Sequence, residues 1–141
     1  MIIPDVNVLI HAYNIASPVH EESKVWWRKT MDDGTPVGLP WVSALGFIRI
    51  MTNRGPGGPA MAVATAVGHV KQWLRRPAVR ILHPGEHHAE ILFSLLEIAG
   101  TGGNLTTDAH LAALAIEYHG ELVSCDTDFA RFPGLRWRKP F

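Results

Sequence analysis

Short apolar runs alternate along this chain with longer stretches in which apolar residues recur every three or four positions. The short runs are typical of buried strands, and the longer stretches predict amphipathic helices. We expect strands at residues 1–4, 36–41, 79–82, 122–125 and 135–138. We expect helices at residues 6–16, 17–31, 43–50, 60–76, 86–99 and 108–118.

Capping and breaking residues set the expected ends of these elements. Ser17 followed by Pro18 has the residue types of a helix start, and Ser43 is placed to cap the next helix. Gly100 and Gly120 are expected to end the helices that they follow. The glycine- and proline-rich residues 55–59 form the clearest predicted loop.

Alternating strands and helices predict an α/β fold with a largely parallel sheet and helices over both of its faces. The length of 141 residues suits a single domain that spans residues 1–141. In such sheets, ligands bind beyond the carboxyl ends of the strands, near the point where strand order reverses.

Four aspartates fall at this predicted edge. Asp5 follows the first strand, and Asp126 and Asp128 follow the strand that ends at Cys125. Asp108 opens a helix, and helices start at the edge where the preceding strands end. We therefore expect these carboxylates to converge, although Asp108 alone could be a helix cap and Asp126 alone could start a turn.

Carboxylates that converge without basic partners repel one another, so a divalent cation is the natural occupant of such a cluster. Mg²⁺ and Mn²⁺ prefer oxygen ligands, and Mg²⁺ keeps several waters while it accepts carboxylates and substrate phosphate oxygens. The pattern therefore favours metal-dependent phosphodiester hydrolysis.

Composition limits how the protein could bind nucleic acid and in which compartment we expect it. The formal net charge is zero, so any nucleic-acid binding must come from a local patch. The single cysteine, Cys125, excludes an internal disulfide and favours a reducing compartment, and neither a secretory signal nor a membrane-spanning run is visible, so we expect a cytoplasmic protein. The candidate phosphate contacts are Arg49, Arg54, Arg131, Arg136, Arg138 and Lys139.

The histidines do not predict a zinc site. His83, His87 and His88 are separated by Pro84 and Gly85, and no HExxH pattern occurs, so we expect solvated surface histidines. His110 lies two residues beyond Asp108 and should point away from it on a helix. Trp26 and Trp27 are adjacent, so one of them should face a helix edge or a partner.

Three segments resemble the PIN-domain family and, within it, VapC toxins. They are PDVNVLI at residues 4–10, TDAHLAALA at residues 107–115 and SCDTDFARFPGL at residues 124–135. The similarity runs in the family's order from the first strand to Arg136 and Trp137. It implies a three-layer α/β/α sandwich, Mg²⁺ or Mn²⁺ dependence, endonucleolytic RNA cleavage as a toxin, a homodimer and inhibition by a VapB-type antitoxin.

In the mechanism that we expect, Asp5, Asp108 and Asp126 hold the metal, directly or through water. Asp128 would orient a water or a second ion. The residues that could support these carboxylates are Asn7, Thr107 and Thr127, although Asn7 could equally cap a helix.

One position departs from the resemblance. The family usually has a glutamate on the helix after the second strand, and Gly46 occupies that place in the segment ALGFIR at residues 44–49. A weakly active or inactive protein that binds RNA or an antitoxin is therefore the second hypothesis. A phosphatase with Asp5 as nucleophile is a third hypothesis, but Asn7 stands where that chemistry needs a second acid.

Overall fold

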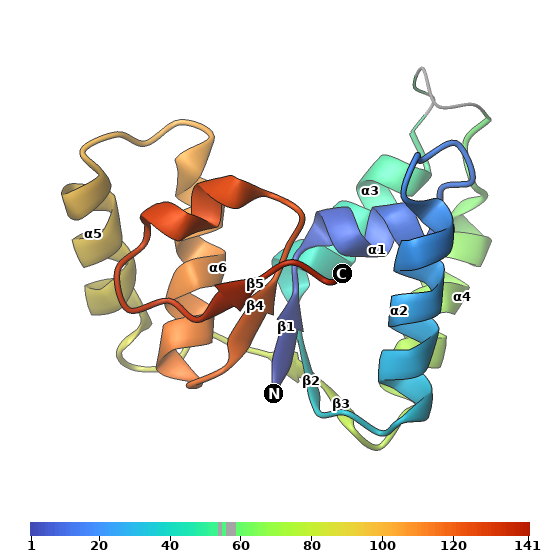
Figure 1. Ribbon diagram of the computed structural model, residues 1–141, viewed down its shortest axis with the longest axis horizontal. Coiled ribbons are helices and arrows are strands. Elements are labelled where there is room, and N and C mark those ends of the chain that lie inside the picture. Colours follow the sequence, from blue (N-terminus) through green and yellow to red (C-terminus); the bar gives the residue numbers. More distant parts are fainter. Residues whose placement is uncertain (54, 56–58) are drawn as a thin grey trace.

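The computed structural model describes residues 1–53, 55 and 59–141, and it contains one parallel sheet (Figure 1). The predicted loop at residues 55–59 lies largely outside the described residues. Five strands pair in the order β3-β2-β1-β4-β5, and each pair is parallel. The strands are β1 (Ile2–Pro4), β2 (Val37–Pro40), β3 (Val79–Leu82), β4 (Glu121–Val123) and β5 (Trp137–Arg138).

Helices cover both faces of this sheet, which confirms the predicted α/β sandwich. In Figure 1, α5 and α6 lie on one side and the first four helices lie on the other. The helices are α1 (Val6–Tyr13), α2 (His20–Asp32), α3 (Trp41–Met51), α4 (Val63–Leu74), α5 (His88–Ala99) and α6 (Leu105–Glu117), with a 3₁₀ helix, η1, at Thr127–Arg131. Chain order reverses between β1 and β4, so the predicted ligand edge is the carboxyl end of these two strands.

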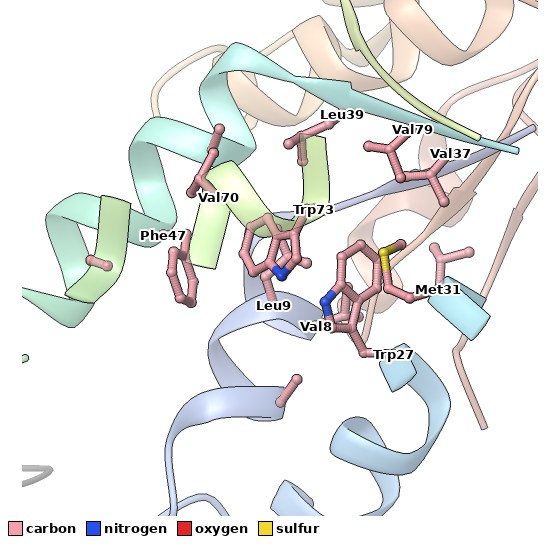
Figure 2. Close-up of a cluster of buried hydrophobic side chains, with 14 residues drawn as sticks. Val8, Leu9, Trp27, Met31, Val37, Leu39, Phe47, Val70, Trp73 and Val79 are labelled. Atoms are coloured by element: carbon pink, nitrogen blue, oxygen red, sulfur yellow. The ribbon is translucent and has the colours of Figure 1, made fainter. Parts of the chain in front are cut away.

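Two cores result from the alternation of side chains along the strands. Ile3 and Leu122 pack against α5 and α6, whereas Leu39 and Val123 pack on the other face. The second face carries an aromatic cluster. Figure 2 shows Phe47, Trp27 and Trp73 around Leu9, and the ring centroids of Phe47 and Trp73 are 4.9 Å apart.

Two predicted caps are wrong. Helix α2 begins at His20, and Ser17 instead accepts a hydrogen bond from the Val19 amide in the turn before it. Ser43 lies inside α3, where its buried hydroxyl donates to the Pro4 carbonyl at 2.8 Å. This buried hydrogen bond fixes α3 to the end of β1, so the serine that was expected to start a helix holds the helix against the sheet.

The predicted stop at Gly120 has a different physical basis. His119 takes the left-handed conformation after α6, with φ of 53°, whereas Gly120 faces β1. A Cβ at Gly120 would lie 2.7 Å from Ile3 Cδ1, so the glycine allows the start of β4 to approach β1. Gly100 ends α5 in the left-handed conformation, as predicted.

The adjacent tryptophans divide as expected, because Trp27 is buried in the core and Trp26 is only partly covered. Within the described ranges, no helix is both long and apolar enough to cross a membrane.

Candidate active site

Asp5 is the most firmly held carboxylate at the carboxyl edge of the sheet. It follows β1, caps α1 and is only 6% exposed. Its Oδ1 accepts a hydrogen bond from the Val6 amide, and its Oδ2 accepts from Asn7 Nδ2 at 2.8 Å and from Ser124 Oγ at 2.7 Å. Burial raises the pKa of Asp5, the hydrogen bonds from Ser124 and Val6 lower it, and the negative charge of Asp126 raises it.

Ser124 joins the carboxyl ends of β1 and β4, and the sequence did not single it out. The side chain is fully buried, and its Oγ donates to Asp5 while it accepts from Asn7 Nδ2 at 2.9 Å and from the Asp126 amide at 3.0 Å. A hydroxyl can both donate and accept, so it can serve three partners at once. The sequence signal that could have identified Ser124 is its position directly after β4 and two residues before Asp126.

Asn7 supports the site and does not cap a helix. It lies in the first turn of α1, whose cap is Asp5. Its Nδ2 donates to Asp5 and Ser124, while its Oδ1 accepts from the Cys125 amide at 3.1 Å. All three contacts position the loop that carries the next acids.

Asp126 and Asp128 lie in one tight turn after β4. Asp126 caps the 3₁₀ helix η1, and its Oδ1 accepts from the Asp128 amide at 2.8 Å. Asp128 also faces Arg131, with 3.7 Å between Oδ1 and Nη2. Asp126 therefore makes the contact expected of a residue that starts a turn, in addition to acting electrostatically on Asp5.

Asp108 approaches the other acids from α6. The helix begins at Leu105, not at Asp108, so Asp108 lies in the first turn and its carboxylate does not cap the helix. The pKa of Asp108 is raised to about 6, first by burial and then by the charges of Asp5, Asp126 and Asp128 in that order. All four predicted acids therefore share one electrostatic environment.

The donor set fits a hard divalent cation that keeps water ligands. Among the described residues, no three histidine, cysteine or acidic side chains form a group that could by itself hold a metal. The acids nevertheless raise the pKa of Asp108 together, which a cation between them would relieve. Mg²⁺ commonly takes only one or two protein carboxylates directly, so the arrangement is compatible with water-mediated ligation.

The predicted support from two threonines is not seen. Thr107 and Thr127 are both exposed. The hydrogen bonds of Asp5, Asp126 and Asp128 in the described part of the chain come from other groups.

Gly46 lies on α3, directly against the start of α1. A Cβ built at Gly46 would lie 2.9 Å from Val6 Cγ2, which is closer than side chains normally approach. Val6 is the residue after Asp5, so a larger side chain at position 46 would press against the start of α1. Where the resemblance implies a glutamate, this chain has a glycine that lets α3 pack closely against α1.

One of the three histidines expected on the surface is buried. His83 and His87 are exposed, as predicted, but His88 is buried and its Nε2 lies 2.9 Å from His110 Nδ1. Burial lowers the pKa of both His88 and His110, which favours a neutral pair that joins α5 to α6.

Two of the candidate phosphate-binding residues are paired with acids. Arg138 Nε contacts Glu121 Oε2 at 3.1 Å, and Arg131 faces Asp128. Arg49, Arg136 and Lys139 are exposed, and the predicted contact at Arg54 lies outside the described residues.

Comparison with known proteins gives the same assignment along the whole chain. The PIN domain model matches residues 2–135. Ribonuclease VapC33 of Mycobacterium tuberculosis is 41% identical over 140 residues, with 99% of this chain and 98% of the relative covered. Ribonuclease VapC37 of the same species is also 41% identical, with 99% and 97% covered.

Solved structures of low sequence identity share the fold. VapC20 of Mycobacterium tuberculosis, a sarcin-ricin loop cleaving toxin, superposes with a TM-score of 0.69 at 18% identity, covering 96% of this chain and 99% of its own. VapBC2 from Rickettsia felis, bound to a promoter DNA fragment, gives a TM-score of 0.68 at 16% identity, covering 99% and 98%. The family model and the two 41% identical relatives together show that this chain belongs to the PIN-domain family and, within it, to the VapC group.

Proposed function

We propose that this protein is a divalent-metal-dependent endoribonuclease that acts as the toxin of a type II toxin–antitoxin pair. The observation that carries the proposal is the gathering of Asp5, Asp108, Asp126 and Asp128 at one edge of the sheet, where their charges act on one another. The names of the 41% identical relatives, both ribonucleases, support the reaction class.

Asp5, Asp108 and Asp126 would hold the metal, directly or through water, and Asp128 would orient a water molecule. When bound, a divalent cation supplies an activated water and stabilises the charge that develops on the phosphate oxygens. Ser124 and Asn7 fix the Oδ2 side of Asp5 by hydrogen bonds, so this carboxylate enters the reaction in one orientation.

Mg²⁺ or Mn²⁺ is the metal that suits these residues. The four candidate groups are all carboxylates, and hard cations prefer oxygen donors. The thiol of Cys125 lies beside them in sequence, but burial and the charge of Asp5 raise its pKa, which disfavours the thiolate that a softer metal would bind.

The proposed partners are an RNA substrate, a VapB-type antitoxin that neutralises the toxin and a second copy of this chain. Two of the structural neighbours are VapBC pairs, one from Rickettsia felis and one from Haemophilus influenzae. These neighbours support the pairing of a PIN domain of this shape with an antitoxin.

A binding protein of low activity is the second candidate, and the glycine in place of the family's glutamate supports it. A Cβ at Gly46 would lie 2.9 Å from Val6 Cγ2, so a larger side chain there would require Val6 to shift. A phosphatase is disfavoured, because the amide of Asn7 is fully engaged with Asp5, Ser124 and Cys125 and has no acidic proton to give.

The deciding experiment is cleavage of total cellular RNA by the purified protein with Mg²⁺ or Mn²⁺, with EDTA as the metal-free condition. Asp5→Asn should abolish the fragments, whereas Asp33→Asn, at an exposed aspartate beyond the end of α2, should leave them unchanged. Fragments that persist in EDTA or in Asp5→Asn would contradict the proposal, and RNA binding without cleavage would favour the second candidate.

A further inference from the structure

RNA binding at the acidic edge calls for a basic side chain that can contact a phosphate. Few basic side chains at this edge are free of ion pairs. The chain has no net positive charge to attract RNA from a distance. Arg131 faces Asp128, and Arg138 contacts Glu121 and donates to the Lys139 carbonyl. Arg49 lies in the last turn of α3, and Arg136 precedes β5 at the opposite, amino end of that strand. Lys139 remains at the carboxyl end of β5, and it forms no ion pair with any residue in the part of the chain that the structure describes.

The strand register brings Lys139 to the acids. β5 runs parallel to β4 with Arg138 opposite Val123, so the residues that follow both strands leave the sheet at the same edge. The Ser124 amide donates to the Arg138 carbonyl at 3.2 Å, which places Lys139 next to the serine that holds Asp5.

The backbone at this point is fixed while the lysine side chain is free. Arg138 is hydrogen bonded to β4, and Pro140, which follows Lys139, is buried. Lys139 itself is exposed. An anchored backbone with a mobile ammonium group suits a contact that must reach a phosphate without a fixed geometry.

We propose that Lys139 is a substrate-positioning residue that binds a phosphate of the RNA next to the one that is cleaved. This inference rests on the proposed ribonuclease function. The cluster of carboxylates repels the RNA backbone, and a divalent cation offsets only part of that charge, so a lysine at the rim lowers the cost of bringing the phosphates to the acids.

The test compares Lys139→Ala with Lys139→Arg and with Lys71→Ala. Lys71 is an exposed lysine on α4, near the helix end that leads toward the amino end of β3, and it serves as the matched control. Cleavage kinetics should show KM raised about three- to tenfold in Lys139→Ala with kcat little changed, recovery in Lys139→Arg, and no change in Lys71→Ala.

Binding of a fluorescent mixed-sequence oligoribonucleotide in EDTA gives a second measurement that does not need cleavage. Lys139→Ala should weaken binding and reduce the slope of log affinity against log salt by about one. If the wild type cleaves RNA but Lys139→Ala behaves like Lys71→Ala in both measurements, the inference is wrong and the proposed function stands.

If the wild type binds this RNA but never cleaves it, the proposed function fails, and the binding measurement alone decides whether Lys139 contacts phosphate. A loss confined to kcat in Lys139→Ala, or no recovery in Lys139→Arg, would also overturn the role in positioning.

Discussion

The two sides of the acidic edge are built in opposite ways. At the junction of β1 and β4, Asp5 is buried and accepts hydrogen bonds from Val6, Asn7 and Ser124. At the first turn of α6, Asp108 is only half-buried. The negative charges of the other acids raise the pKa of its carboxyl group. The protein thus organises one carboxylate with its own donors, whereas the other is placed where a bound cation or a proton relieves the repulsion.

After the loss of cleavage expected for Asp5→Asn, the largest effect on this contrast comes from Asp108→Asn. Because the amide is a weaker metal ligand and carries no charge, RNA cleavage should fall by more than about 100-fold, above the range for residues that only support a metal ligand. Cleavage assays at saturating Mg²⁺ check this. Asp33→Asn is the control, and near-normal cleavage by a folded Asp108→Asn protein would show that α6 contributes no essential acid.

Ser124→Ala should have the next largest effect, because it removes the hydroxyl that joins Asp5 to the Asp126 turn. We expect cleavage to fall about 10- to 100-fold and the free energy of unfolding to fall by about 1–3 kcal/mol. The measurements are cleavage kinetics and urea denaturation.

Ser23→Ala is a matched control, since Ser23 is also fully buried but its hydroxyl has no hydrogen-bond partner among the described residues. It should leave cleavage unchanged and stability equal or slightly higher. Equal effects of the two substitutions would mean that Ser124 matters only for packing.

The contrast between the two sides also explains what the sequence could predict. Asp5, Asp126 and Asp108 were found because parallel strands and the helices that follow them share one edge, which is a property of topology. Ser124 was missed because a serine after a strand has no distinctive pattern, and its value depends on a partner 119 residues away in the sequence.

The errors at Ser43 and His88 have the same origin. Local rules assign a serine to a helix start and a histidine to the surface, but Ser43 bonds to Pro4 and His88 to His110 across the fold. Thr107 and Thr127 were assigned to the site by adjacency in sequence, and the direction of each side chain was not predictable. The packing of Gly46 against Val6 likewise depends on how α1 and α3 approach.

A smaller effect is expected from filling Gly46. Gly46→Ala should lower the free energy of unfolding by about 1 kcal/mol, because overpacking against Val6 outweighs the gain in helix propensity. In a Val6→Ala background the methyl clash is removed, so the same substitution should stabilise the protein by up to about 1 kcal/mol. Denaturation of the four proteins in this cycle measures the coupling.

The same background allows the vacant acid position to be tested. If position 46 faces the metal, Gly46→Glu with Val6→Ala should bind Mg²⁺ or Mn²⁺ more tightly than Gly46→Gln with Val6→Ala, as measured by calorimetry. Unchanged or weaker affinity for the glutamate variant would show that Gly46 does not mark a vacated ligand position.

The last effect is on stability as a function of pH, and it follows from the repulsion at Asp108. In the metal-free folded protein the pKa of Asp108 is about 6, above its ordinary value of 3.8, so the folded state binds the proton more tightly than the unfolded chain does. Stability therefore falls as pH rises from about 4 to about 6, and the penalty is complete above that range. The Asp108→Asn protein lacks the destabilisation caused by ionised Asp108. It should therefore be more stable than the wild type above pH 6 and lose that advantage below pH 4.

Divalent cations should raise the stability of the folded protein, and they should do so only when Asp108 is ionised. At pH above 6, Mg²⁺ at ten times its dissociation constant should stabilise the wild type by about 1.4 kcal/mol, and the effect should shrink as the pH falls and protons compete for Asp108. Thermal unfolding with Mg²⁺ or with EDTA across this range measures both slopes. If the metal effect does not depend on pH, or if Asp108→Asn responds to Mg²⁺ as the wild type does, the repulsion at the start of α6 is relieved by something other than the cation.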